Sequence, residues 1–362
     1  MDSYAFTVAR TNVRKFSLHH FSKNPSLLEG EVHLEIEKYA FTANNITYAV
    51  LGEELRYFQF FPALDPIMEV IIPVWGIGRV VRSLVPEVKI GSRFYGFFPM
   101  AKDLVTLPGK VRDTGFTDTK PHRTNLPAVY NYYSDLKVDE MHRDQFEDLE
   151  LVFRPLFTTS FLIDDYLALN QFFNSDQILI TSASSKTAIA LVYLLQLRKS
   201  SNPNLKIIAL TSKSNYGFVN ALGCYDEVYL YDQIEEIKME KTTIIDFRGN
   251  QDFLKQLKLY FESQLNFLSL VGLVQWEERK KTTESSIGTV FFAPHQVKRR
   301  AKEWGLDGFQ KKLSQSWQNF LPFADQKFKI QLATNPEDIE KIYMQNLEGK
   351  VPPNLAYVIS HS

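Results

Sequence analysis

A run of small hydroxyl side chains with one lysine among them, residues 181–187, offers the clearest chemistry in this sequence. The apolar residues 178–180 before it are typical of a strand buried on both faces, and apolar residues recur with helical spacing from 188 to 195. Strand, short polar loop and helix N-terminus form the first half of a βαβ unit, where backbone N–H groups can bind a phosphate. The candidate contacts are Ser182, Ser184, Ser185, Lys186 and Thr187.

This serine loop contains no glycine, although glycine normally lets the backbone approach a pyrophosphate closely. Serine and alanine are the next smallest residues, so close approach is impaired and not excluded. Four hydroxyl groups and a lysine can bind a phosphate through charge-assisted hydrogen bonds. The alternative is that the loop is only a hydroxyl-capped helix start.

A second loop with hydroxyl groups and a lysine follows the next predicted strand, residues 206–210. Sites that prefer NAD carry an acidic residue there, which binds the ribose 2′-hydroxyl, and this loop has none. A lysine among hydroxyl groups suits a 2′-phosphate and favours NADP(H); the alternative is a solvated loop lysine. The candidate contacts are Thr211, Ser212, Lys213 and Tyr216. Residues 246–249 follow the fourth strand, where we expect backbone contacts with a cofactor.

Helices and strands alternate from residue 157 onward, and they must position both loops. The predicted strands are residues 178–180, 206–210, 227–230, 243–247, 266–274 and 290–292, and the predicted helices are residues 160–170, 216–222 and 253–261. This alternation predicts a doubly wound, Rossmann-type parallel sheet, and hence an α/β protein. Residues 296–320 are expected to form one or two helices, with Lys298, Arg299, Arg300 and Lys302 on a solvated face.

Short strands and turns characterise the first third of the chain and predict a compact, partly open β-barrel. Residues 41–48 are interpreted as a polar loop within it, and residues 108–150 as a surface excursion. At the other end of the chain we expect a strand at residues 328–332, a helix at 336–347 and a strand at 356–360. The proposed division is a β domain of residues 1–155 completed by residues 322–362, and a nucleotide-binding domain of residues 156–321.

The composition is that of an ordinary globular protein of 362 residues, 44% hydrophobic and 23% charged. A formal net charge of −1 gives no electrostatic case for binding nucleic acid or an anionic membrane. The single cysteine, Cys224, excludes an internal disulfide and a cysteine-rich metal site, so we expect a reducing, cytoplasmic compartment. No apolar run is long enough to span a membrane. The 28 Phe and 17 Tyr indicate either bulky packing or an aromatic ligand cleft.

Several motifs stand in the order found in the medium-chain dehydrogenase/reductase superfamily. Tyr48 with Gly52 resembles the Tyr-x-x-x-Gly of its zinc-free quinone oxidoreductases, and Gly91-Ser92-Arg93-Phe94-Tyr95-Gly96 resembles its Gly-Asp-Arg-Val-x-Gly. Residues 73–81 stand where the superfamily has its Gly-x-Val strand, and residues 221–228 resemble its Ala-Leu-Gly-Ala-Asp-Glu-Val. Thr-Ala-Asn-Asn-Ile-Thr-Tyr-Ala and Ser-Ala-Ser-Ser-Lys-Thr-Ala are similar to strings of an uncharacterised bacterial family that carries a domain of unknown function.

The superfamily resemblance implies a GroES-like domain beside the Rossmann-type domain, and hydride transfer from NADPH to a quinone or enone in the cleft between them. Tyr48 is then the group that polarises the carbonyl or delivers a proton, with Asn44 or Asn45 orienting the substrate. The superfamily's cysteine ligands and Gly-His-Glu segment are missing, so no zinc is expected. A small, apolar carbonyl substrate and a homodimer are further expectations from the resemblance.

Two alternatives stay open at this point. The chain resembles an active reductase, but the missing glycines also fit a relative that no longer catalyses and instead senses a nucleotide or binds a partner. An accessory reductase for a fatty-acyl or polyketide-like pathway is the other possibility.

Overall fold

The computed structural model describes residues 3–21, 25–271 and 288–361. The chain divides into two compact units. The β-rich unit comprises residues 1–152 and 328–362, and the parallel-sheet unit comprises residues 153–327. Each unit is described by itself.

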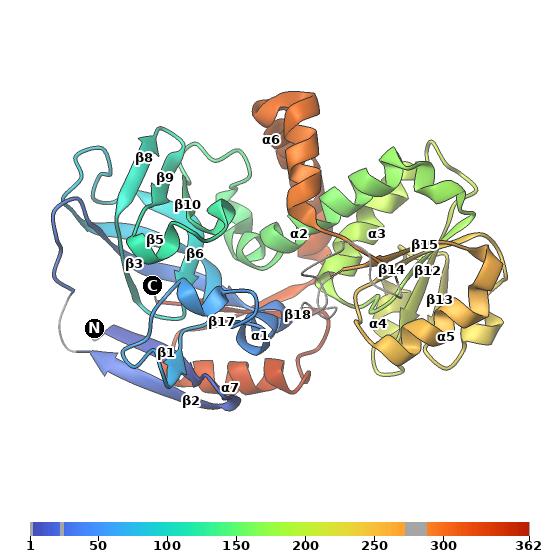
Figure 1. Ribbon diagram of the computed structural model, residues 1–362, viewed down its shortest axis with the longest axis horizontal. Coiled ribbons are helices and arrows are strands. Elements are labelled where there is room, and N and C mark those ends of the chain that lie inside the picture. Colours follow the sequence, from blue (N-terminus) through green and yellow to red (C-terminus); the bar gives the residue numbers. More distant parts are fainter. Residues whose placement is uncertain (1–2, 22–24, 272–287, 362) are drawn as a thin grey trace. The chain divides into compact units, whose positions relative to one another are not determined.

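Six parallel strands form the sheet of the parallel-sheet unit (Figure 1). They are β11 (Gln177–Ile180), β12 (Lys206–Thr211), β13 (Glu227–Leu230), β14 (Thr242–Asp246), β15 (Leu265–Leu270) and β16 (Thr289–Val290). Their order, β13-β12-β11-β14-β15-β16, reverses direction between β11 and β14. This confirms the doubly wound sheet and places its switch point next to the serine loop. Residues 272–274 of the predicted fifth strand lie outside the described residues.

Helices pack on both faces of this sheet. The helices of the unit are α2 (Glu147–Leu169), which begins in the β-rich unit, α3 (Lys186–Arg198), α4 (Tyr216–Ala221), α5 (Gln251–Phe261) and α6 (Ala293–Lys327). Ile208 and Leu210 of β12 pack in one core with α5, whereas Ala209 packs in another with Val219 of α4. Because neighbouring residues of a strand face opposite sides, α4 and α5 cover opposite faces.

Two helices differ from the sequence-based prediction. The helix predicted at residues 160–170 begins at Glu147, thirteen residues earlier, and continues through Pro155 because Leu151, Val152 and Phe153 bury their side chains along it. In α6, Gly305 (φ +73°) breaks the helix, which explains why the sequence fitted either one helix or two. The prediction of a solvated basic face is wrong for Arg300, which is buried and forms an ion pair with Asp165 at 2.6 Å.

The β-rich unit contains two sheets. Its strands are β1 (Ser3–Ala9), β2 (Asn12–Phe21), β3 (Val32–Phe41), β4 (Glu69–Val70), β5 (Pro73–Ser83), β6 (Arg93–Pro99), β7 (Asp103–Thr106), β8 (Pro108–Arg112), β9 (Gly115–Asp118), β10 (Tyr132–Asp135), β17 (Lys329–Ala333) and β18 (Leu355–Ser360). One sheet has the order β2-β1-β4; the other runs β17-β18-β3-β5-β6-β10-β9-β8, with β7 also paired to β3. Helix α7 (Pro336–Leu347) packs Tyr343 against Phe6 and Phe16, so the end of the chain closes the core of its beginning (Figure 1).

Two segments of this unit correct the sequence analysis. The loop predicted at residues 41–48 contains α1 (Ala43–Val50), whose first turn is held by a capping box between Thr42 and Asn45. The excursion predicted at 108–150 contributes β8, β9 and β10 to the large sheet. Its polar residues suggested a surface position, but Arg123 and Asp118 are buried and pair with each other at 2.8 Å.

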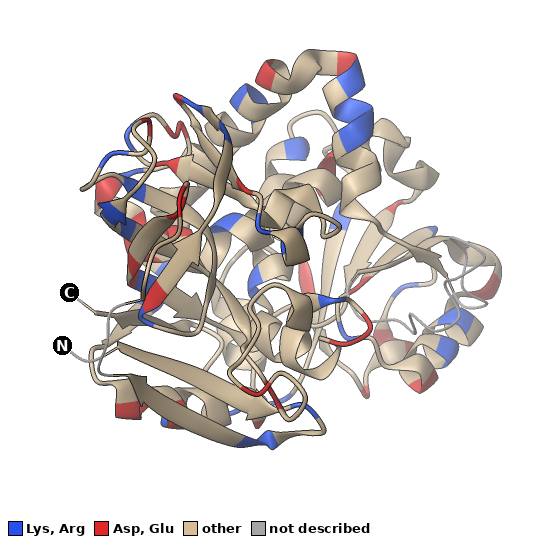
Figure 2. Ribbon diagram, turned by 60° about the vertical axis from the view of Figure 1, so that its left-hand side comes forward, with Lys and Arg blue, Asp and Glu red and all other residues tan. Residues whose placement is uncertain are grey.

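Charged side chains of both signs are interspersed along both units (Figure 2), in keeping with the near-zero net charge. None of the helices that the structure describes is long and apolar enough to cross a membrane.

Candidate functional site

One residue of the serine loop has a backbone conformation that favours glycine. Ser182 lies in the left-handed region at φ +46°, where a side chain is strained and glycine is favoured. Ser185, three residues later, caps α3: its Oγ accepts the N–H of Ala188 at 3.2 Å. The remaining N–H groups of the first helical turn lack acceptors within the helix, as at every helix start, and favour an anion. A serine therefore holds a backbone conformation here that favours glycine.

Lys186 and Thr187 form the first two positions of α3. Burial penalises the charged form of Lys186 and lowers its pKa to about 8, although part of its side chain still reaches the surface. An anion beside this ammonium would stabilise its charged form and raise its pKa again. The backbone of Thr187 is fixed by Ser160 of α2, whose Oγ donates to the Thr187 carbonyl at 2.8 Å.

The second loop lies beside the first at the carboxyl edge of the sheet, because β11 and β12 are neighbours. Asn215, which the sequence analysis missed, bridges the loops: its Nδ2 donates to Ser184 Oγ at 2.9 Å. Lys213 and Tyr216 are exposed, and Ser212 shares a hydrogen bond with Ser214 at 2.9 Å. Thr211 is fully buried, and its hydroxyl has no hydrogen-bond partner within the described part of the chain.

Asp246 organises the turn that follows β14. Its buried carboxylate accepts the Thr181 hydroxyl at 2.5 Å and the backbone N–H groups of Arg248 and Gly249 at 3.2 and 2.8 Å. The Thr181 hydroxyl in turn accepts the N–H of Phe247 at 3.0 Å. The ends of β11 and β14, which border the switch point, are thus fixed to each other by short polar contacts.

Two tyrosines contact the serine loop from the β13 side of the sheet, and no sequence pattern pointed to either contact. The Tyr231 hydroxyl accepts the backbone N–H of Ser182 at 3.0 Å, and the Tyr225 hydroxyl donates to the Ala183 carbonyl at 3.0 Å. The Arg248 guanidinium lies over the Tyr231 ring, 3.9 Å from its centroid. The N–H of Ser182 and the carbonyl of Ala183 are therefore held by side chains.

In the β-rich unit, Tyr48 is buried on α1, and Asn44 one helical turn earlier donates Nδ2 to its hydroxyl at 2.8 Å. Burial, reinforced by nearby Tyr130, raises the pKa of Tyr48 well above its usual value, so the hydroxyl stays protonated. Because the Tyr48 oxygen accepts from Asn44, the hydroxyl proton is not used in that hydrogen bond. Asn45 instead uses its side chain within the fold, accepting from Thr42 N at 2.8 Å and donating to Pro73 O at 3.1 Å.

Aromatic rings surround Tyr48. The Tyr57 ring lies 4.2 Å from that of Tyr48, between centroids, and the Tyr57 and Tyr130 hydroxyls are hydrogen-bonded at 2.9 Å. Phe97 and Trp75 complete the cluster, with their centroids 5.1 Å apart. In this unit, at least part of the high aromatic content forms a packed cluster around the candidate hydroxyl group, as the packing alternative predicted.

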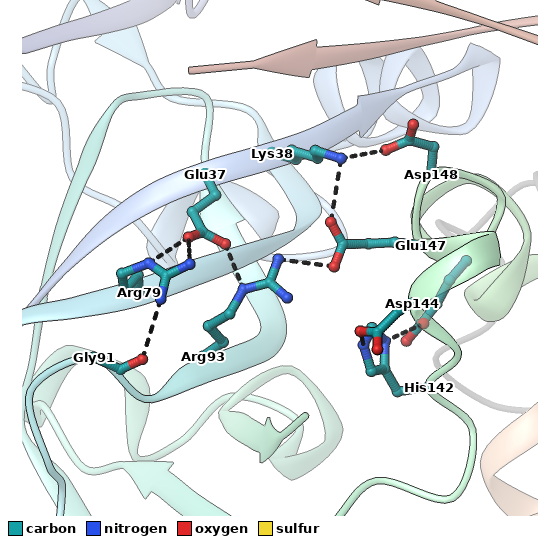
Figure 3. A network of polar contacts seen from close by, with 10 residues as sticks. Glu37, Lys38, Arg79, Gly91, Arg93, His142, Asp144, Glu147 and Asp148 are labelled. Atoms are coloured by element: carbon teal, nitrogen blue, oxygen red, sulfur yellow. Dashed lines mark hydrogen bonds and ion pairs between the residues drawn. The ribbon is translucent and has the colours of Figure 1, made fainter. Parts of the chain in front are cut away.

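One group of side chains has the composition of a metal site. His142, Asp144 and Glu147 can each offer a ligand atom, and these atoms all lie within 4.8 Å of one another (Figure 3). The same groups already form ion pairs: Glu147 pairs with Arg93 at 2.8 Å and with Lys38 at 3.2 Å. His142 Nδ1 is hydrogen-bonded to Glu150 at 2.8 Å. The sequence analysis overlooked this cluster. Because its side chains already pair with one another and with neighbouring described residues, we interpret it as a salt-bridge network.

The fold resembles that of several solved structures. CurA from Vibrio vulnificus, crystallised in complex with NADPH, aligns at a TM-score of 0.58 with 11% identity over 99% of each chain. CurK enoyl reductase aligns at 0.56 with 13% identity over 99% of each chain. A protein from Bacillus thuringiensis described as a putative NADPH:quinone reductase aligns at 0.54, with 12% identity over the whole of both. The chain therefore has the GroES-like plus Rossmann fold of medium-chain dehydrogenase/reductase proteins.

Sequence comparison identifies the family of the chain. No curated protein matches the chain. Residues 39–352 match the model of a family described as "Protein of unknown function (DUF2855)", which covers most of both units. The chain belongs to the DUF2855 family.

Proposed function

We propose that this protein is an NADPH-dependent, zinc-independent oxidoreductase that reduces a quinone or an enone-type substrate. The observation that carries the proposal is the pair of hydroxyl- and lysine-bearing loops at the carboxyl edge of β11 and β12, joined by the Asn215–Ser184 hydrogen bond. The carboxyl edge beside the switch point is where a doubly wound sheet binds a dinucleotide.

The residues present fit that cofactor. Ser182 keeps the left-handed turn that usually requires glycine, and α3 follows it with an N-terminus suited to the pyrophosphate. Lys213 at the end of the second loop supplies a cation suited to a 2′-phosphate. The orphaned hydroxyl of Thr211 lies at the same edge. Ser184, Ser185, Lys186, Thr187, Ser212 and Tyr216 complete the proposed contacts.

NADPH, when bound, supplies the hydride. Tyr48 is proposed to donate a hydrogen bond or a proton to the substrate carbonyl, because its raised pKa keeps it protonated and its oxygen is already bonded to Asn44. Asn44 orients this hydroxyl. Asn45 acts only by holding the start of α1 against Pro73.

Zinc independence rests on the donor set. The chain has one cysteine, and the His142 group directs its carboxylates to Arg93, Lys38 and the imidazole itself. A zinc ion would have to displace these partners.

Reduction of the substrate by NADPH tests the proposal directly. Purified protein should oxidise NADPH in the presence of a small set of quinones and α,β-unsaturated ketones, with one reduced product formed per cofactor consumed. Tight NADPH binding without oxidation of NADPH by any substrate would instead support the nucleotide-sensing alternative, which the buried Tyr48 and the non-glycine loop also fit.

A further inference from the structure

The side chains of Arg248 and Tyr231 contact each other across the carboxyl edge of the parallel sheet. Arg248 follows β14 and Tyr231 follows β13, and in the strand order β11 and β12 lie between them. The Arg248 guanidinium nevertheless stacks on the Tyr231 ring, 3.9 Å from its centroid. The two side chains therefore meet over the ends of β11 and β12, the strands that carry the two candidate loops.

The backbone of the serine loop is tied to this pair. The Tyr231 hydroxyl accepts the N–H of the strained residue Ser182 at 3.0 Å. At the other end, the backbone of Arg248 is fixed by Asp246, through the turn described above. Phe253 of α5 supports both partners, with its ring edge against Tyr231 and its centroid 4.8 Å from the guanidinium. The cation is thus anchored by stacking and by its backbone.

The hydrogen-bonding groups of Arg248 are left available by this arrangement. The residue is exposed, and within the described residues its guanidinium has two aromatic neighbours and no recorded ion-pair or hydrogen-bond acceptor. A guanidinium that lies over an aromatic ring still has N–H groups pointing outward in its own plane. These N–H groups can bind a phosphate in a fork.

We propose that Arg248 is a phosphate-binding residue for the adenosine half of a dinucleotide, and that Tyr231 is the positioning residue that holds it and the serine loop together. The inference rests on the proposed function and adds a specific cation to it. The opposite interpretation is also testable: in it, the Arg248–Tyr231 pair fills the position of the adenosine and blocks dinucleotide binding.

The experiment compares Kd values of NADPH, NADH and adenosine 2′,5′-bisphosphate for the full-length protein and four variants. Arg248→Met should weaken NADPH about ten- to a hundredfold, as expected when a charge-assisted contact is removed. Arg248→Lys should recover part of the loss. Arg112→Met, which removes an exposed arginine of the β-rich unit, is the matched control and should leave every Kd unchanged.

Tyr231→Phe retains the ring and removes the hydroxyl, and should weaken NADPH and NADH by the same factor, because it acts through the loop. For Arg248→Met, a loss confined to NADPH and the bisphosphate assigns the cation to the 2′-phosphate, and an equal loss for NADH assigns it to the pyrophosphate. Unchanged or tighter NADPH binding by Arg248→Met overturns the inference. Lack of NADPH binding by the unmodified protein would instead reject the proposed function.

Discussion

The proposed preference for NADPH over NADH depends on the exposed ammonium of Lys213 in the second loop. Lys213→Glu replaces it with a carboxylate, which repels a 2′-phosphate but can accept a hydrogen bond from a ribose hydroxyl. We expect NADPH binding to weaken by roughly a hundredfold and NADH binding to change by less than about threefold. Calorimetric titration with both cofactors measures the ratio. Equal effects on the two would remove Lys213 from the 2′-phosphate site.

The hydroxyl of Tyr48 is the group proposed to act on the substrate. Tyr48→Phe retains the ring stacked on Tyr57 and removes only the hydroxyl, so the fold and NADPH binding should stay unchanged. Turnover should fall by about a hundredfold or more, as is usual for the loss of a proton donor. Tyr130→Phe, which removes a hydroxyl bonded only to Tyr57 among the described residues, is the control. Full turnover by Tyr48→Phe would exclude the proposed role.

At the scale of the loop, the strain at Ser182 gives a stability prediction. A left-handed backbone costs a non-glycine residue roughly 1–2 kcal/mol, and the greater freedom of unfolded glycine offsets about half of that gain. Ser182→Gly should therefore leave the free energy of unfolding unchanged or raise it by up to about 1 kcal/mol. The neighbouring Ala183→Gly, outside the left-handed region, should lower it by about 1 kcal/mol. Urea unfolding measures both; a clearly destabilising Ser182→Gly would contradict the strain.

At the start of α2, the His142 network gives a pH prediction. Burial lowers the pKa of His142, but the hydrogen bonds to Glu150 and Asp144 outweigh it and hold the pKa above the ordinary 6.5. A raised pKa in the folded state stabilises the fold below the unfolded pKa, and this contribution is lost as pH rises through the folded value. As the pH rises above 6.5, the free energy of unfolding of the unmodified protein should therefore fall by more than that of the His142→Gln variant. The exposed His20→Gln is the control, and an unaltered pH profile in His142→Gln would contradict the account.

The elements that were predicted correctly are those with a strong repeating pattern. The strand at residues 227–230 and the helix at 336–347 have the predicted bounds, and the Asn335-Pro336 helix start is a local signal for the helix. Helix α1 was missed because its Asn-Asn-Ile-Thr sequence has weak helix propensity, and tertiary packing of Tyr48 and Ala49 stabilises it. The left-handed turn at residues 171–174 has no sequence signal either.

The site was predicted only as far as strand ends determine it. Neighbouring parallel strands bring their following loops together, so the pairing of the two loops followed from the order of β11 and β12. The contacts between the loops depend on side chains that reach across the sheet, as Tyr231 does to Ser182 and Asn215 to Ser184. Such reach is set by the folded geometry and not by spacing in the sequence.

For the whole molecule, the structural resemblance to CurA and CurK enoyl reductase covers both units, while identities of 11–13% show only the fold. The predicted homodimer stays a prediction, for which sedimentation of the purified protein at several concentrations is the test. A reductase of this fold without glycine in its first loop needs other groups to hold the phosphates. The serine loop, Lys213 and Arg248 are the groups that we propose for this role.

Titration of the purified protein with NADPH and with NADH, followed by nicotinamide fluorescence or calorimetry, tests this account most directly. The account predicts saturable binding of one NADPH per chain, with NADPH bound more tightly than NADH. Absence of binding by either cofactor at millimolar concentration would contradict it, because the two loops would then be a capped helix start and a solvated surface.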